Sequence, residues 1–241
     1  MKFSYFFIVC IFSATLLLGQ QKETTTLSTN TNNISLLGYS GLLYTPSAYI
    51  AEWGEIYAGL THYDKEVAFT FDAGKRNERS FVTNIGFLPF AEFSLRLTKP
   101  YNSKGEHYGI GDRSISGRVR LMKEKQHLPA VVIGVNDLGT ESSFFNTSYV
   151  VLSKRIPYKT LFINGNLGYG FKLNEARRHY LQEFFGGVQV TWKSIDLITE
   201  YDTDQWNMGL GYTYKRFFYA KVALISMQHL SFNVGFQFNI R

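Results

Sequence analysis

Charged residues inside otherwise apolar or small-residue segments are the first candidates for chemistry in this chain. They are Glu92, Arg96, Arg118, Arg120 and Glu200, and Asp202 could extend the set. Each alternates with apolar neighbours, which places it on one face of a β-strand. Carboxylates and guanidinium groups in an enclosed space form charge-assisted pairs, and buried charges are generally paired. We therefore expect these side chains to form ion pairs inside the folded protein.

The spacing of the remaining reactive residues does not predict a catalytic or metal site. The five histidines show no paired ligand spacing. Asp112, Asp137 and Glu141 fall near loop ends, but without the alternating oxygen ligands of a calcium loop. The single cysteine, Cys10, lies in an apolar N-terminal run, which excludes a disulfide framework. We expect no metal, no cofactor and no enzymatic activity.

The amino-acid composition narrows the possible classes of protein further. The chain has 241 residues, with 25 Lys and Arg against 19 Asp and Glu and a formal net charge of +6. Aromatic residues make up 17% and charged residues only 18%, which excludes a disordered chain. The mean hydropathy of −0.12 excludes a bundle of membrane helices. The basic charge is dispersed, so we expect no nucleic-acid partner. A one-domain, aromatic-rich β protein remains.

Strict alternation dominates the chain after residue 54. From Leu230 to Ile240, large apolar residues alternate with Ser, Asn, Gly and Gln, and residues 92–98, 114–121 and 206–213 repeat the pattern. Such runs have about the nine to eleven residues of a tilted membrane-spanning strand, longer than strands of soluble domains. The small polar face is typical of a barrel interior. We predict an all-β, antiparallel transmembrane β-barrel of the outer-membrane type rather than a soluble sandwich.

Short turns and longer connections alternate between the predicted strands, as expected when turns face the periplasm and loops face outside. This predicts about 12 strands, within a range of about 10–14. The larger number requires strands at Val67–Phe71 and Gly41–Thr45. The predicted strands cover about 55–63, 79–88, 91–99, 112–122, 128–137, 147–155, 159–170, 183–192, 195–203, 206–214, 217–225 and 229–240. An aromatic girdle is predicted from Trp53, Trp192, Trp206, Tyr57, Tyr158, Tyr201 and Tyr219.

The N-terminal part divides into segments by composition. Residues 1–20 predict a cleaved signal peptide, because a lysine precedes an apolar run too short to span a membrane as a helix. Residues 21–37 predict a polar linker, and residues 38–241 the barrel, with 38–54 as a plug-like segment leading into it. Thr45-Pro46-Ser47 could fold into the lumen as part of a plug or form a tight turn. The frequent use of proline in turns favours the turn.

Three stretches in a fixed order resemble one protein family. The first is Gly41–Ala48 with Trp53-Gly54; the second runs from Asp112 to Lys154; the third is Glu200–Asp202 with Asn207–Leu210. Together they resemble the YjbH family of outer-membrane exopolysaccharide and capsule biosynthesis proteins, over most of residues 38–214. The residues that carry the resemblance include Thr45, Pro46, Asp112, Arg113, Asp137, Lys154, Glu200, Asp202 and Asn207.

The resemblance implies a non-enzymatic barrel in the outer membrane that assists exopolysaccharide or capsule biosynthesis or export. The partners implied are outer-membrane lipid and lipopolysaccharide, an anionic polysaccharide, and other polysaccharide-export proteins. The inward charges could then contact an anionic sugar polymer or form a structural network of ion pairs, and the general pairing of buried charges favours the network. Arg177, Arg178 and His179 could meet lipopolysaccharide phosphates or form a solvated loop tip.

Two alternative functions remain open at this point. The barrel could be a small general channel or a structural barrel. It could also be a lipid-modifying enzyme of the outer membrane, with Ser142, Ser143 and His179 near the outer rim, although no motif joins these three residues.

Overall fold

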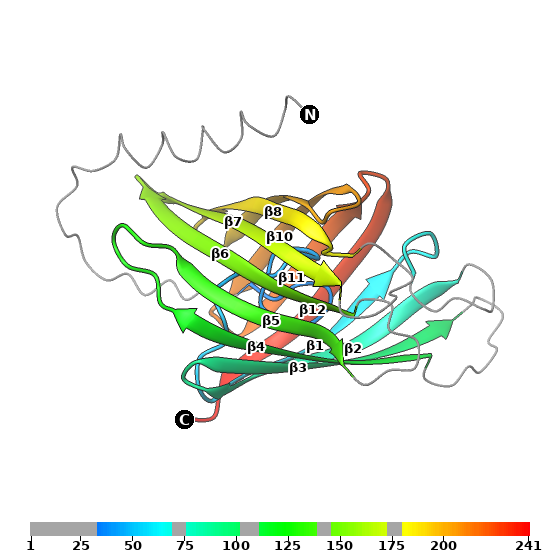
Figure 1. Ribbon diagram of the computed structural model, residues 1–241. Helices are drawn as coiled ribbons and strands as arrows, with labels where there is room; N and C mark the ends of the chain where they lie inside the picture. The colour runs from blue at the N-terminus through cyan, green and yellow to red at the C-terminus, as the bar shows by residue number, and fades with distance from the viewer. Residues whose placement is uncertain (1–32, 69–75, 102–110, 139–145, 173–179) are drawn as a thin grey trace. The chain divides into compact units, whose positions relative to one another are not determined.

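The computed structural model describes residues 33–68, 76–101, 111–138, 146–172 and 180–241. These residues form twelve strands, each antiparallel to its neighbours, and β1 pairs with β12 to close a barrel (Figure 1). No described residues form a helix long and apolar enough to cross a membrane. The strands are β1 (Glu55–Tyr63), β2 (Asn77–Leu88), β3 (Ala91–Tyr101), β4 (Asp112–Met122), β5 (Ala130–Leu138), β6 (Thr147–Tyr158), β7 (Leu161–Lys172), β8 (Glu183–Trp192), β9 (Ile195–Tyr201), β10 (Trp206–Tyr214), β11 (Phe218–Ile225) and β12 (His229–Asn239).

The alternation in the sequence becomes the two faces of the barrel wall. In β12, Phe232, Val234 and Phe236 are 40–49% exposed, whereas Ser231 and Asn233 are fully buried. The exposed face is apolar because lipid surrounds it, and closure pairs the backbone groups that lipid cannot satisfy. The predicted antiparallel transmembrane β-barrel of the outer-membrane type, with about 12 strands, is therefore confirmed.

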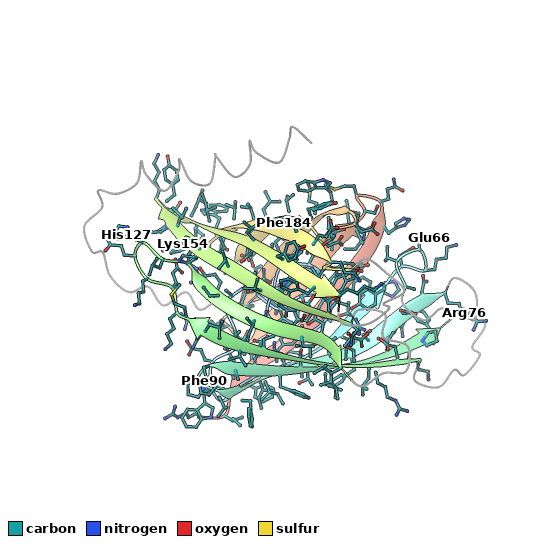
Figure 2. The ribbon with its side chains drawn as sticks, in the orientation of Figure 1. Glu66, Arg76, Phe90, His127, Lys154 and Phe184 are labelled. Atoms are coloured by element: carbon teal, nitrogen blue, oxygen red, sulfur yellow. The ribbon has the colours of Figure 1, made fainter. Side chains whose placement is uncertain are left out.

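The two ends of the barrel differ in their connections. Both the start of β1 and the end of β12 lie at the end that carries the short turns, because Glu55 is in register with Asn239. Phe90 and His127 mark this short-turn end in Figure 2, and Glu66 and Arg76 mark the opposite, loop end. In barrels of the outer-membrane type, the short turns face the periplasm and the longer loops face outside.

Some predicted boundaries were wrong. Residues 156–158, predicted as a turn, continue β6, and the chain turns at residues 159–160 instead. The fourteen-strand alternative is also wrong for residues 41–45, because they lie in the lumen and not in the wall. The other strand of the fourteen-strand alternative was Val67–Phe71, and its last three residues lie outside the described residues.

The predicted girdle is correct for its tryptophans but not for two tyrosines. Trp53, Trp192 and Trp206 are about half exposed near strand ends. Tyr57 and Tyr219 instead point into the lumen and are almost fully buried. Their direction follows from alternation, because Tyr57 shares a face with Thr61 and Tyr219 shares one with Lys221, both of which are lumenal.

Candidate functional site in the barrel lumen

Residues 33–51, here called the lumen plug, lie inside the barrel ahead of β1. Figure 1 shows this segment in blue within the ring of strands. Its apolar side chains join the wall in one buried cluster, with Leu36 and Leu43 fully buried. Two isolated bridges, Ile34 with Ser40 and Gly41 with Pro46, are its β-pairings. Further backbone hydrogen bonds lie within the plug, such as Leu36 amide to Leu43 carbonyl at 2.8 Å, and the remaining backbone groups need partners on the wall.

The plug changes two sequence-based interpretations. Residues 33–37 were assigned to a polar linker, but they are buried in the lumen. Thr45-Pro46-Ser47 was interpreted as a turn rather than a plug. The chain reverses at residues 42–45 instead, where the Leu42 amide donates to the Thr45 carbonyl at 2.8 Å, and Pro46 follows this turn in the bridge to Gly41, inside the plug. The earlier segments, residues 1–20 and 21–32, lie outside the described residues.

Glu200, on β9, binds the tip of this turn. Its carboxylate accepts hydrogen bonds from the backbone amides of Leu43, Tyr44 and Thr45 at 3.0, 2.7 and 3.0 Å. The Thr45 hydroxyl and the Asn207 side-chain amide add donors at 2.8 and 3.1 Å. Five neutral donors thus solvate a fully buried carboxylate, and no ion pair to Glu200 is present among the described residues.

Glu92, on β3, binds the plug at two further points. Its carboxylate accepts from the Ser40 amide at 3.0 Å, from the Ser40 hydroxyl at 2.6 Å and from the Ala51 amide at 2.7 Å. Arg118, its cross-strand neighbour on β4, forms an ion pair with it and donates to the Ser47 carbonyl at 2.9 Å. The pair therefore binds both a backbone donor and a backbone acceptor of the plug.

Cationic and hydroxyl side chains of the wall donate hydrogen bonds to carbonyl groups of the plug. Lys221, on β11, donates to the Ile34 and Leu42 carbonyls. Thr61 and Tyr63, on β1, both donate to the Leu36 carbonyl, at 2.9 and 2.5 Å. Lumenal polar side chains thus replace the hydrogen bonds that regular secondary structure would supply.

Lumenal glycines make room for the plug leucines. A Cβ at Gly187 would lie 2.6 Å from Leu42 Cδ1, and one at Gly209 would lie 2.7 Å from Leu43 Cδ2. Both distances are well inside van der Waals contact, so a larger residue at either position displaces the leucine or the wall. The glycines leave space for Leu42 and Leu43, and Glu200 binds the amides beside them. Packing and hydrogen bonding therefore favour the same position for the turn in the lumen.

The structure brings part of the predicted charge set together. Arg96 pairs with Asp112 at 2.8 Å, and Glu92 pairs with Arg118. Glu200 belongs to the lumen as well, but its partners are backbone amides of the plug. Arg120 does not join the set, because its guanidinium donates to the Pro89 carbonyl at the short-turn end.

The remaining residues that carry the family resemblance are scattered. Asn207 bridges Glu200 and Asp202, at 3.1 and 2.8 Å. Lys154 is half-exposed and pairs with Glu124 at 3.0 Å. Asp137 is buried with a positive φ of 58° and accepts from Asn146 through its carbonyl. Arg113 faces outward on β4. Glu141, Ser142, Ser143, Arg177, Arg178 and His179 lie outside the described residues.

Sequence reasoning missed Lys221, residues 33–37 of the plug and the contacts that hold the plug. Lys221 could have been found from its place in the alternation, where a lysine between apolar residues must face inward. The plug has no periodicity, so its signal was indirect: apolar residues at 36–37 and 42–44 in a segment without strand alternation, opposite lumenal glycines in β8 and β10.

Asp202, at the loop end beyond β9, has a pKa that is high for an aspartate. Burial and the nearby Glu200 carboxylate raise the pKa of Asp202 to about 6, although hydrogen bonds from Asn207 and from the Asp204 and Gln205 amides act in the opposite direction. The Asp202 charge therefore changes just below neutral pH, two residues from the carboxylate that holds the plug tip.

A small cavity lies between the plug and the wall. It is lined by Asn33, Gly41, Leu42 and Ser47 of the plug and by Asn164 and Gln189 of the wall, and it measures about 10 Å³, enough for about one water molecule. Across the described ranges, no three His, Cys, Asp or Glu side chains are grouped to hold a metal ion. The expectation of no metal or cofactor stays a prediction.

The fold and the lumen define the class as a transmembrane β-barrel whose interior is filled by its own N-terminal segment. The sequence model of the YjbH family, described as exopolysaccharide biosynthesis protein, matches residues 33–178, more than half of the chain. The protein therefore belongs to the YjbH family, as the resemblance indicated. The match begins at the first described residue of the plug and ends before the stretch that contains Glu200.

Other comparisons add little to this assignment. No curated protein sequence matches the chain significantly. Among solved structures, an active-site mutant of outer membrane phospholipase A from Escherichia coli is similar, with a TM-score of 0.43 and 14% sequence identity. The alignment covers 78% of this chain and 91% of the phospholipase chain.

Proposed function

We propose that this protein is a non-enzymatic barrel of the outer membrane that assists the biosynthesis or export of an exopolysaccharide or capsule. Family membership is the observation that carries the proposal. The partners proposed are outer-membrane lipid, lipopolysaccharide, an anionic polysaccharide and other polysaccharide-export proteins. In this function the lumenal charges hold the plug in place, because Glu92, Arg118 and Glu200 already use their donors and acceptors on it.

The plug in the lumen supports an assisting role over a general channel. A general channel needs a continuous aqueous path, whereas the apolar side chains of the plug pack with the wall in one buried cluster. The enzyme alternative depends on Ser142, Ser143 and His179, which lie outside the described residues.

The proposal is tested by deleting the gene and measuring surface polysaccharide. We expect less surface polymer, or polymer of altered length, and recovery when the wild-type gene is restored. Sensitivity to a large hydrophilic antibiotic serves as the control for a general loss of the outer-membrane barrier. Normal polymer in the deletion strain would remove the polysaccharide role and leave the barrel fold unaffected.

A further inference from the structure

The loop end of the barrel has a cationic sector on its lipid-facing surface. Arg79 on β2, Lys99 on β3 and Arg113 on β4 are all exposed and face outward, within three residues of the loop end of their strands. Arg79 and Lys99 are directly opposite one another in the ladder, and Arg113 is opposite Leu97, two residues along β3 from Lys99. We call these three residues the cationic sector.

The rest of this rim is different in character. At the loop ends of β7, β8 and β10, the outward residues are Phe171, Phe184 and Trp206, each more than half exposed. Aromatic residues there are expected of a membrane interface. The three neighbouring cations therefore distinguish the loop end of β2, β3 and β4 from that of β8 and β10.

The cationic sector has no counter-charge in the described part of the chain. No ion pair joins Arg79, Lys99 or Arg113 to a described carboxylate, and Asp64, at the end of β1, faces His229 at 3.7 Å. Like charges directly opposite in a sheet are destabilising, so Arg79 and Lys99 gain from an anion between them. The Arg79 guanidinium is 4.1 Å from the centre of the Tyr101 ring, which holds it in position.

An apolar hollow lies beside the cationic sector on the same outer surface. Gly117 lines it, four residues from Arg113 along the outward face of β4, together with Val119, Ile133, Val150 and Phe171. Its volume is about 350 Å³. The β4–β5 register shifts between Ile115 and Gly117, and a Cβ at Gly117 would meet no atom within 4 Å. The hollow is therefore open to an apolar chain from the bilayer.

We propose that Arg79, Lys99 and Arg113 bind the phosphate groups of a phosphorylated, multiply acylated lipid of the outer leaflet, and that one of its acyl chains occupies the hollow beside Gly117. Charge complementarity selects the headgroup, and the apolar lining selects the chain. This inference rests on the outer-membrane placement proposed above but not on the polysaccharide role. Basic residues near an anionic lipid surface contribute to binding individually, so three of them give a substantial preference.

The test compares lipid binding by three forms of the purified, folded barrel in detergent, with diphosphoryl lipid A as the probe and native mass spectrometry as the readout. The first form is wild type, and the second carries R79Q, K99Q and R113Q. The third is the charge-matched control with K159Q, K193Q and K215Q, at the short-turn end. Heat-modifiable migration in gels confirms that each form is folded. We expect the second form to bind lipid A on the order of a hundredfold more weakly, and the control to bind like wild type.

Further measurements separate the contribution of the phosphorylated headgroup to binding from that of the acyl chain. Dephosphorylated lipid A and soluble glucosamine phosphate should both bind poorly to wild type, because each lacks one half of the recognised structure. Gly117→Phe should weaken lipid A binding several-fold while leaving all three cations in place. If the triple variant does not fold, Arg113→Gln alone should still weaken binding about fivefold. Equal binding by the cationic-sector variants, equal loss in the control, or equal affinity for phosphatidylglycerol would overturn the proposal.

Discussion

Glu92 and Glu200 both hold the lumen plug, but their charges are compensated differently. Glu92 pairs with Arg118, which belongs to the wall, so its counter-charge does not come from the plug. Glu200 accepts from four donors of the plug and from Asn207, and no described cation forms an ion pair with it. A buried carboxylate without donors is costly, so Glu200 and the plug tip depend on each other. We therefore expect the region around Glu200 to depend on the plug more strongly than the region around Glu92.

The largest effect is expected from Glu200→Ala. Three buried amides lose their acceptor, and we expect the free energy of unfolding in lipid vesicles to fall by about 3–5 kcal/mol. Single-channel recordings should show openings that wild type lacks, because the plug tip is released. Glu200→Gln, which retains one acceptor oxygen, should give a smaller loss. A stability within about 0.5 kcal/mol of wild type would contradict the dependence of the plug on Glu200.

Arg118→Leu should have the next largest effect. It leaves Glu92 buried without its cation and removes the donor to the Ser47 carbonyl, for a loss of about 2–4 kcal/mol. Adding Glu92→Gln should recover part of this loss, because the unpaired charge is then gone. Urea unfolding of the single and double variants measures the difference. A double variant that is less stable than Arg118→Leu alone would show that the pair is not the source of the loss.

Gly209→Val tests the fit between the plug and the wall. The new side chain collides with Leu43, and overpacking of this kind costs about 1–3 kcal/mol. Leu43→Ala in the same chain should recover part of the loss. Gly165→Val is the matched control, since a Cβ at Gly165 meets nothing within 4 Å. If Leu43→Ala gives no recovery in thermal unfolding, Leu43 does not set the space beside Gly209.

The smallest effect on stability is expected from a change in pH. The pKa of Asp202 is raised to about 6 in the folded protein, above the usual value near 4. The folded state therefore binds a proton more tightly than the unfolded state, and stability falls as pH rises from about 4 to about 6. We expect the melting temperature to be higher at pH 5 than at pH 7.5, with a smaller difference in Asp202→Asn. An unchanged difference in that variant would assign the pH effect to other groups.

The barrel wall could be predicted from sequence because each strand carries its own signal. Residues such as Phe232 and Asn233 must face opposite sides, and lipid selects which side is apolar. The inward direction of Glu92, Arg96, Arg118 and Glu200 followed from the same rule. Strand ends were less certain: Ile156, Pro157 and Tyr158 suggested a turn, but pairing with β7 extends the strand through them.

The lumen plug could not be predicted with the same success because its conformation depends on the wall. Five of its amides donate to Glu92 and Glu200, which lie 41 to 52 and 155 to 157 residues further along the chain. No local pattern encodes such contacts, and Pro46 correctly signalled a turn without revealing where the turn lies. The partners of the predicted charges were therefore the part that required the structure.

Hydrogen–deuterium exchange of the backbone amides at residues 43–45, with the protein in lipid nanodiscs, tests the central claim most directly. If Glu200 binds these amides inside the lumen, they should exchange as slowly as amides of the wall strands, and Glu200→Ala should remove the protection. Exchange in the wild-type protein at the rate of an unstructured peptide would show that the plug does not occupy the lumen.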